Sequence, residues 1–200
     1  MRICTLGAVR NRLLLPFALL VVAPLAACGG SSKPSSSATT PSSAAGSGTT
    51  AHVAVPVSAN PSTSAKMICA KEGATDIYEQ ATGVKTVAPF KPTWVDHVYS
   101  CDYVYPNGAK FTLSVKELAN ADETTAYFNS LADSLHKTKD VVIAQGGFQT
   151  ADGSVVVRKD FKVLTVDVAK LPANFGVPSA PRGDVAQNVA AAIMSCWTGA

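Results

Sequence analysis

Asp96 and His97 are neighbours in the sequence and supply two of the side-chain types that general acid–base catalysis uses most often. On a β-strand, adjacent side chains point to opposite faces, so this pair cannot form a catalytic dyad there without a bulge. In a loop before a strand, either side chain can contact a ligand. We expect His97 to be a loop histidine bonded to the backbone. The alternative is a cell-envelope hydrolase or transferase that uses His97 and Asp96.

The remaining sequence carries no recognised catalytic or metal-binding pattern. It has no Gly-x-Ser-x-Gly, His-Glu-x-x-His, phosphate-binding glycine loop, calcium-binding loop or Cys-x-x-Cys. The other two histidines, His52 and His136, fall in a polar tract and at the end of a predicted helix. The sequence therefore predicts no catalytic residue, no cofactor and no metal site.

Aromatic residues gather on both sides of His97. They are Trp94, Tyr99, Tyr103, Tyr105 and Phe111. Core packing is the common role of such residues, but they can also line a pocket between a sheet and its helices. We take Trp94, His97 and Tyr99 as possible ligand contacts.

Basic residues gather around a second predicted hairpin, at Arg158, Lys159, Lys162 and Lys170. Such residues can bind an anionic envelope polymer, although lysines on an edge strand more often prevent aggregation between strands. The chain has 17 basic and 14 acidic residues, but three of the basic ones precede Cys28. The chain after Cys28 is therefore neutral, and no basic cluster with interleaved aromatics indicates nucleic-acid binding.

The N-terminal residues have the pattern of an export signal. A basic beginning precedes an apolar stretch, Leu13–Pro24, which is too short to span a bilayer. The run Leu25-Ala26-Ala27-Cys28 then resembles the lipobox of bacterial lipoproteins. This resemblance implies that residues 1–27 are removed and that Cys28 carries lipid, which anchors the chain on the extracytoplasmic side of a cell membrane. The alternative is a plain secretory signal with an incidental cysteine.

Residues 28–65 are predicted to form a flexible linker. Residues 29–65 are dominated by Ser, Thr, Ala, Pro and Gly, and Lys33 is their only charge. As a flexible coil this segment would have an end-to-end distance of about 35 Å. Residues 66–200 then have the length of a single globular domain.

Periodicity within residues 66–200 predicts three helices. The first covers Ser64–Thr82, the second covers Asn120–Thr138, and the last runs from about Gly183 to Trp197. Asn120 and Glu123 have capping-box spacing at the start of the second helix. Its expected buried stripe is Tyr127, Phe128, Leu131 and Leu135.

Strands are predicted between these helices. Residues Trp94–Glu117 form a hairpin, and the turn Tyr105-Pro106-Asn107-Gly108 places Tyr103 opposite Phe111. Further strands are expected at Val141–Ala144, near Phe148, at Ser154–Arg158 and at Phe161–Val168. This order predicts an α+β fold, with an antiparallel sheet of four to five strands and about three helices mainly on one face.

Three cysteines remain after Cys28, at positions 69, 101 and 196. An exported chain favours a disulfide, and an odd number leaves one cysteine over. We favour Cys69–Cys101, which ties the first helix to the sheet and contributes about 3.7 kcal/mol in the chain-entropy model. Cys196 is then a free thiol or the partner in an alternative pairing with Cys101.

The lipobox, the linker and three sequence runs together resemble a group of small actinobacterial cell-envelope lipoproteins. The runs are Trp94-Val95-Asp96-His97-Val98-Tyr99-Ser100-Cys101, Leu113-Ser114-Val115-Lys116-Glu117-Leu118 and Cys196-Trp197-Thr198-Gly199. The resemblance implies an envelope location and a compact domain, and it transfers no catalytic residue. We expect a non-catalytic module that binds either an envelope ligand, such as a lipid or a polymer, or a membrane partner protein.

Overall fold

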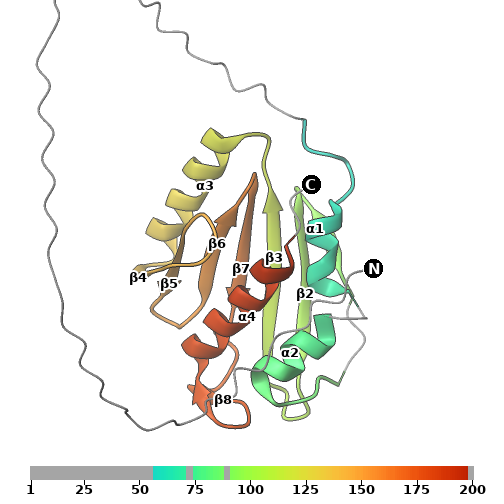
Figure 1. Ribbon diagram of the computed structural model, residues 1–200, viewed down its shortest axis with the longest axis vertical. Helices are drawn as coiled ribbons and strands as arrows, with labels where there is room; N and C mark the ends of the chain where they lie inside the picture. Colours follow the sequence, from blue (N-terminus) through green and yellow to red (C-terminus); the bar gives the residue numbers. More distant parts are fainter. Residues whose placement is uncertain (1–55, 71–73, 88–90, 198–200) are drawn as a thin grey trace, which may run out of the picture. The chain divides into compact units, whose positions relative to one another are not determined.

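An antiparallel sheet of seven strands forms the centre of the structure, a computed structural model that describes residues 56–70, 74–87 and 91–197 (Figure 1). The strands are β1 (Thr93–Val95), β2 (Val98–Val104), β3 (Lys110–Glu117), β4 (Lys137–Val141), β5 (Gly147–Thr150), β6 (Val155–Lys159) and β7 (Lys162–Asp167). They lie in the order β1-β2-β3-β7-β6-β5-β4. The predicted signal peptide, Cys28 and the predicted linker up to residue 55 lie outside the described residues.

The α+β class and the antiparallel sheet are confirmed, and the sheet has more strands than expected. The turn at Asp96 and His97 separates β1 from β2 within the region predicted as the first arm of the hairpin, and β5 forms around Phe148, where the sequence indicated only a short piece. The strand predicted at Val141–Ala144 was wrong beyond Val141, because β4 begins at Lys137 and ends at Val141. A separate two-stranded sheet, β8 (Asn174–Phe175) with β9 (Ala180–Pro181), was not predicted.

The register of the β2–β3 hairpin is the predicted one. Tyr103 pairs with Phe111 and Cys101 with Leu113. The side chains on this face of the hairpin are almost fully buried, whereas Asp102, on the other face, is exposed. Because a slip of one residue would exchange the two faces, burial of the apolar face selects this register.

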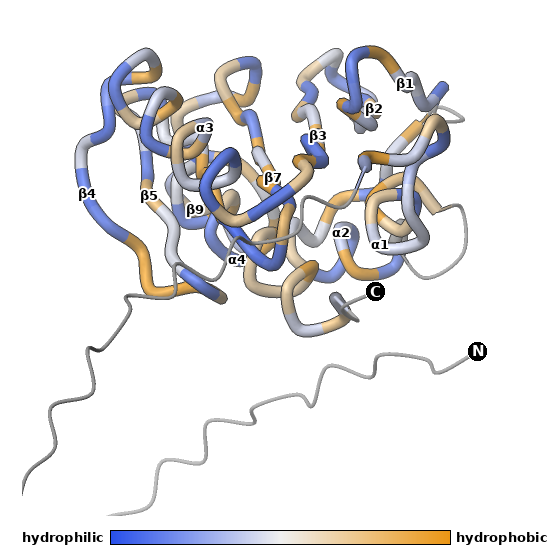
Figure 2. Tube along the Cα trace, turned by 90° about the horizontal axis from the view of Figure 1, so that it is seen from above, coloured by the Kyte–Doolittle hydropathy of each residue, from blue (hydrophilic) through white to orange (hydrophobic). Residues whose placement is uncertain are grey.

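Helices cover both faces of the sheet, as Figure 2 shows. The helical segments are α1 (Thr63–Lys66), the 3₁₀ turn η1 (Met67–Cys69), α2 (Ala74–Thr82), α3 (Ala121–Ser134) and α4 (Arg182–Cys196). On β6, Val155 and Val157 belong to the main core beneath α1, α2 and α4. Val156 points the other way and packs in a second cluster under α3. The prediction that the helices lie mainly on one face holds for α1, α2 and α4, whereas α3 lies on the other face.

The predicted first helix is divided. Ala70 has extended backbone angles (φ −69°, ψ 131°), which end the helical conformation after Cys69. Met67, Ala70, Ile77 and Ala81, four members of the predicted face, nevertheless pack against the core. The predicted stop at Gly83 is confirmed, because Gly83 has a φ of 65° and its N–H donates to Glu79.

Helix α3 begins as predicted and ends earlier. The Asn120 side chain accepts a hydrogen bond from the Glu123 N–H at 2.8 Å, while the Glu123 carboxylate accepts from the Ala119 N–H. The helix ends at Ser134, and residues 137–138, which were assigned to it, begin β4. Leu135 is consequently 39% exposed and not part of the buried stripe.

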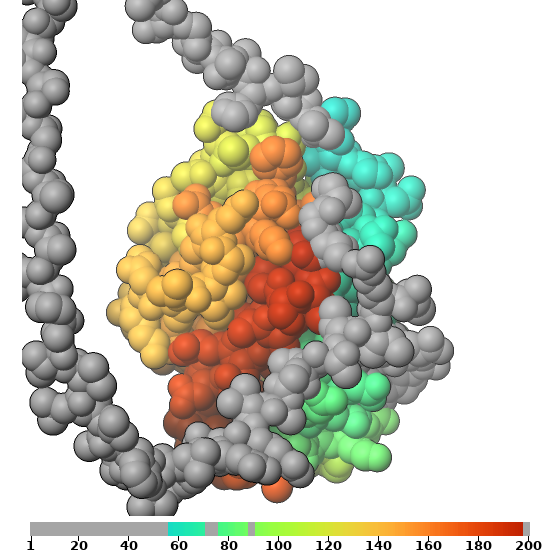
Figure 3. All heavy atoms as spheres, in the orientation of Figure 1, coloured from blue at the N-terminus to red at the C-terminus, as the bar shows by residue number. Residues whose placement is uncertain are grey.

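Helix α4 covers the middle of the main face, and Figure 3 shows it in red beside α1 and α2. Val185, Val189, Ala192 and Ile193 of its predicted face are buried. Ala186 and Ala190 are also fully buried, so the contact face is wider than the predicted stripe.

A disulfide joins Cys69 of η1 to Cys101 of β2, with their Cα atoms 6.0 Å apart. This is the favoured pairing, and it excludes Cys101–Cys196 in this structure. Cys196 ends α4, with its Sγ 3.8 Å from the Ser195 hydroxyl.

The folded unit begins before residue 66. Ser64 and Ala65, which the prediction placed in the linker, are buried. Upstream of them, the Ser62 N–H donates to Glu117 at 3.0 Å, and the carbonyl of Ala59 accepts from the Trp94 indole at 2.8 Å. The chain is thus attached to the sheet near the β1–β2 turn and the end of β3.

Candidate functional site

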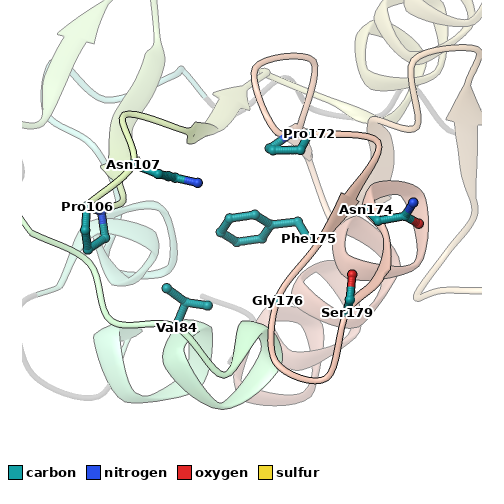
Figure 4. A pocket seen from close by; sticks show the side chains of 8 residues that line it. All are labelled: Val84, Pro106, Asn107, Pro172, Asn174, Phe175, Gly176 and Ser179. Atoms are coloured by element: carbon teal, nitrogen blue, oxygen red, sulfur yellow. The ribbon is translucent and has the colours of Figure 1, made fainter.

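A groove of about 370 Å³ lies at the end of the sheet where the β2–β3 hairpin turns (Figure 4). Its walls come from the hairpin tip, the loop after β7 and Val84, which lies two residues after the end of α2. The lining residues are Val84, Pro106, Asn107, Pro172, Asn174, Phe175, Gly176 and Ser179. The volume falls near the lower end of the range of ligand sites, which is about 300–1,000 Å³.

The hairpin tip is held by its own turn chemistry. Pro106 occupies the position where its fixed φ favours a turn, and Gly108 takes a φ of 78°. The Asn107 side-chain oxygen accepts a hydrogen bond from the Ala109 N–H at 3.0 Å. This bond leaves the amide nitrogen of Asn107 directed into the groove, as Figure 4 shows.

The facing loop, residues 172–179, is attached to the end of α2. The Val177 N–H donates to the Thr82 carbonyl at 2.7 Å. A Cβ on Gly176 would lie 2.7 Å from the same Thr82 oxygen, and Gly176 has a φ of 101°. Only glycine accommodates both this backbone conformation and this close approach.

The start of α4 holds the same loop from the other side. The Arg182 N–H donates to the Ala173 carbonyl at 2.9 Å, and its guanidinium donates to the Leu171 and Ala169 carbonyls. These bonds engage one backbone oxygen of the loop and two just before it, so Arg182 holds the start of the groove wall against α4.

Phe175 connects the groove to the core. Its ring lies between the hairpin tip and the side chains of the facing loop (Figure 4), and only 6% of the residue is exposed. The Tyr105 ring packs behind it, with centroids 4.6 Å apart. Burial raises the pKa of Tyr105 to about 12, which keeps this phenol neutral at physiological pH.

The groove is neutral in its lining. Among the described residues that form its walls, none has an ionisable side chain, and the polar groups are two amides and one hydroxyl. A second hollow, which shares Val84 with the groove, is lined in part by Asp76, Glu79 and Lys85. These charged side chains therefore line the neighbouring hollow and not the groove.

The predicted ligand contacts lie at the opposite end of β2. Trp94 pairs with Tyr99 across β1 and β2, and the rings of Trp94 and His97 meet edge-on at 5.6 Å. The seven residues of β2 span about 23 Å between these positions and the hairpin tip. The three residues do form one cluster, but none of them lines the groove.

Asp96 and His97 occupy the two central positions of the β1–β2 turn. Both have positive φ angles, 49° and 58°, as a two-residue turn of this kind requires. The His97 carbonyl accepts from the Glu117 N–H, and the Lys116 ammonium donates to the Asp96 carbonyl. Within the described part of the chain, no hydrogen bond joins the Asp96 carboxylate to the His97 ring.

Most of the remaining aromatic residues belong to the core. The hydroxyls of Tyr78 and Tyr103 both donate to the Ile68 carbonyl, and the ring of Phe111 stacks on Tyr103 at 4.9 Å. Burial raises the pKa of Tyr78 and Tyr103 above the ordinary value. Core packing, the commoner role considered for these residues, is the one observed.

The prediction of a basic edge at the second hairpin was wrong. Strands β6 and β7 lie inside the sheet, whose edges are β1 and β4. Arg158 donates to Thr125 and lies over the Phe128 ring, Lys159 donates to the Trp197 carbonyl, and Lys162 is buried. Only Lys170 of this set is exposed.

Sequence reasoning missed the groove, although its signals were present. Pro172, Gly176 and Pro178 mark a loop between β7 and α4, and Pro106-Asn107 marks a turn. Nothing in that pattern predicts that the hairpin tip and the loop, which are more than 60 residues apart, lie side by side. One of the contacts that hold the loop there is the hydrogen bond from Val177 to Thr82.

The described residues contain no group of three histidine, cysteine or acidic side chains placed to hold a metal ion. Of the helices in this part of the chain, none has the length and apolar composition needed to cross a bilayer. Comparison of the chain with protein-family models, curated proteins and solved structures finds no match.

Proposed function

We propose that this chain is a lipid-anchored, extracytoplasmic lipoprotein whose folded unit is a non-catalytic binding module. The observation that carries the proposal is the groove between Asn107 and Phe175, which has fixed walls and a neutral lining. Concave sites with apolar walls and a few convergent polar groups are the usual form of ligand sites.

The chemistry of the lining favours binding over catalysis. General acid–base catalysis uses a side chain that titrates near the working pH, and proline, valine, phenylalanine and asparagine do not titrate. Asp96 and His97 lie about 23 Å away at the far end of β2, with their backbone groups engaged in a tight turn.

The attachment of the chain also supports the proposal. Ala59 and Ser62 contact the end of the sheet that carries the β1–β2 turn. A lipid on Cys28 would therefore be connected to the domain at that end, which is the end of β2 opposite to the groove.

Native mass spectrometry of the chain from residue 28 onward, exported with Cys28→Ser, tests the binding function. We expect a reproducible adduct that denaturation removes. Ser179→Trp, which fills the groove from an exposed position, should abolish the adduct. Ser130→Trp on the exposed surface of α3 is the matched control and should retain it. A wild-type domain that carries no adduct and also takes up no ligand added in solution would contradict the proposal.

The anchor has its own test. Growth with an alkynyl palmitate should label the full chain, and Cys28→Ala should remove the label and release the protein from the membrane fraction. Retention of the label on Cys28→Ala would refute lipidation at this residue.

A further inference from the structure

We propose that the groove binds an uncharged saccharide, with Asn107, Asn174 and Ser179 bonding its hydroxyl groups and Phe175 and the prolines contacting its C–H surface. This inference rests on the proposed binding function and assigns the chemical class of the ligand.

The hydrogen-bonding groups suit a ligand that carries hydroxyls. The Asn107 oxygen is used by the Ala109 N–H, so its amide nitrogen is left to donate. Asn174 and Ser179 are exposed, and their side chains bond no other residue in the described part of the chain. A side-chain amide and a hydroxyl each donate and accept, as each hydroxyl of a sugar also does.

The apolar groups suit a small, rigid ligand with a flat C–H surface. Pro106 and Pro172 place exposed rings on opposite sides of the Phe175 ring, and Val84 closes one end (Figure 4). These four side chains are interrupted by the polar groups and form no continuous apolar channel. An acyl chain would leave the amides without partners, which is costly once water is excluded.

The absence of charge from the lining selects against an anionic or cationic ligand. Binding a phosphate or carboxylate in a partly desolvated site needs a basic side chain or several aligned N–H donors. Lys85 faces the neighbouring hollow with Glu79 and Asp76 instead of the groove. The ligand that the lining matches is therefore neutral and polar.

The volume limits the size of the ligand. About 370 Å³ accommodates roughly one or two sugar rings, and the open groove allows a longer chain to continue beyond its ends. Because Gly176 and Arg182 fix the loop before binding, little conformational entropy is lost when the ligand enters.

Asn107→Asp is the most selective variant for a test. Aspartate keeps the oxygen that accepts from the Ala109 N–H, so the turn is retained, and it removes the amide donor that faces the groove. Asn129→Asp, at an exposed position of α3, adds the same charge elsewhere and is the matched control. The probes are uncharged oligosaccharides of two to six residues on an array, with laurate in solution as the apolar comparison.

We expect the exported chain to bind at least one saccharide on the array, and its affinity in solution to fall about tenfold in Asn107→Asp and in Asn174→Ala. Asn129→Asp should leave the affinity unchanged. Binding of laurate without any saccharide, or saccharide binding that the groove variants do not affect, would overturn the inference.

The two proposals fail separately. A native adduct whose mass is not that of a saccharide, and which Ser179→Trp removes, would refute the saccharide and retain the binding module. A wild-type chain that shows neither a native adduct nor any binding on the array would refute the binding module itself.

Discussion

Gly83 and Val177 approach each other so closely that a Cβ atom on Gly83 would lie 2.0 Å from the Val177 carbonyl oxygen. Gly83 directly follows the last residue of α2, and Val177 belongs to the loop that forms one wall of the groove. The contact connects the helix end to the groove across almost 100 residues of sequence, so the loop cannot shift without disturbing α2.

Gly83→Ala should therefore destabilise the protein by about 2–4 kcal/mol, through both its φ of 65° and the collision with Val177. Urea unfolding measures the change. Gly108→Ala is the control, because Gly108 has a φ of 78° but no atom lies within 4 Å of the position that a Cβ on it would occupy. Gly108→Ala should lower the free energy of unfolding by only about 1 kcal/mol. Equal effects of the two variants would contradict the contact.

Removal of the Cys69–Cys101 disulfide should lower the free energy of unfolding by about 3–4 kcal/mol, because the bond closes a loop over a sequence separation of 32 residues. The double variant Cys69→Ser/Cys101→Ser is compared with wild type in urea. Ser100→Ala, next to Cys101 but on the other face of β2, should change stability by less than about 1 kcal/mol. Full stability of the double variant would show that the bond contributes little.

The second cluster should contribute measurably to stability. Phe148 is fully buried and meets the Phe128 ring at 5.1 Å, so Phe148→Ala should cost about 3–5 kcal/mol. Leu135→Ala should cost less than about 1 kcal/mol, since Leu135 lies beyond the end of α3 and is partly exposed. A large loss of stability in Leu135→Ala would mean that Leu135 is packed against the sheet, as the predicted longer helix required.

Acid should weaken the fold partly through Asp102. Hydrogen bonds from Lys110 and then Thr112 hold the pKa of this carboxyl below its ordinary value. A lowered pKa in the folded state stabilises the protein above the unfolded-state pKa of about 4, and this contribution is lost as the pH falls through the folded-state pKa. Asp102→Asn should thus lose less stability than wild type between about pH 6 and about pH 2, as followed by thermal unfolding. Parallel pH curves for the two proteins would contradict the shift.

Asp96→Asn/His97→Asn should leave ligand binding intact and change stability by less than about 1 kcal/mol. Asparagine accepts the positive φ angles of this turn, so the β1–β2 connection is retained. Native mass spectrometry reads out the adduct. If this variant were folded but lost an activity that the wild type shows on an envelope substrate, the hydrolase or transferase alternative would replace the binding module.

Local patterns predicted the elements that local interactions determine. The β2–β3 register followed from Pro106, Gly108 and the alternation of apolar residues, and the start of α3 followed from Asn120 and Glu123. The end of α3 was wrong because the polar residues 136–138 are compatible with a helix, and only the pairing of β4 with β5 shows that a strand begins at Lys137.

The groove and the sheet order depend on contacts between distant segments. Strand β7 pairs with β3 and β6 pairs with β5, which places both strands of the second hairpin inside the sheet and removes the basic edge that the sequence suggested. Likewise, the loop of Phe175 is held beside the hairpin tip by its hydrogen bonds to Thr82 and Arg182 and by the contact of Phe175 with Tyr105. Neither relationship has a signature at the spacing of a single helix or hairpin.

The attachment of the chain at Ala59 and Ser62 determines how far from the lipid a ligand would be met. Between Cys28 and Ala59 a flexible coil would have an end-to-end distance of about 30 Å, and the length of β2 separates this attachment from the groove by about 23 Å. A tether of this length would let the groove sample a volume outside the membrane that is much wider than the groove itself, so an extended polymer there could be met at many points.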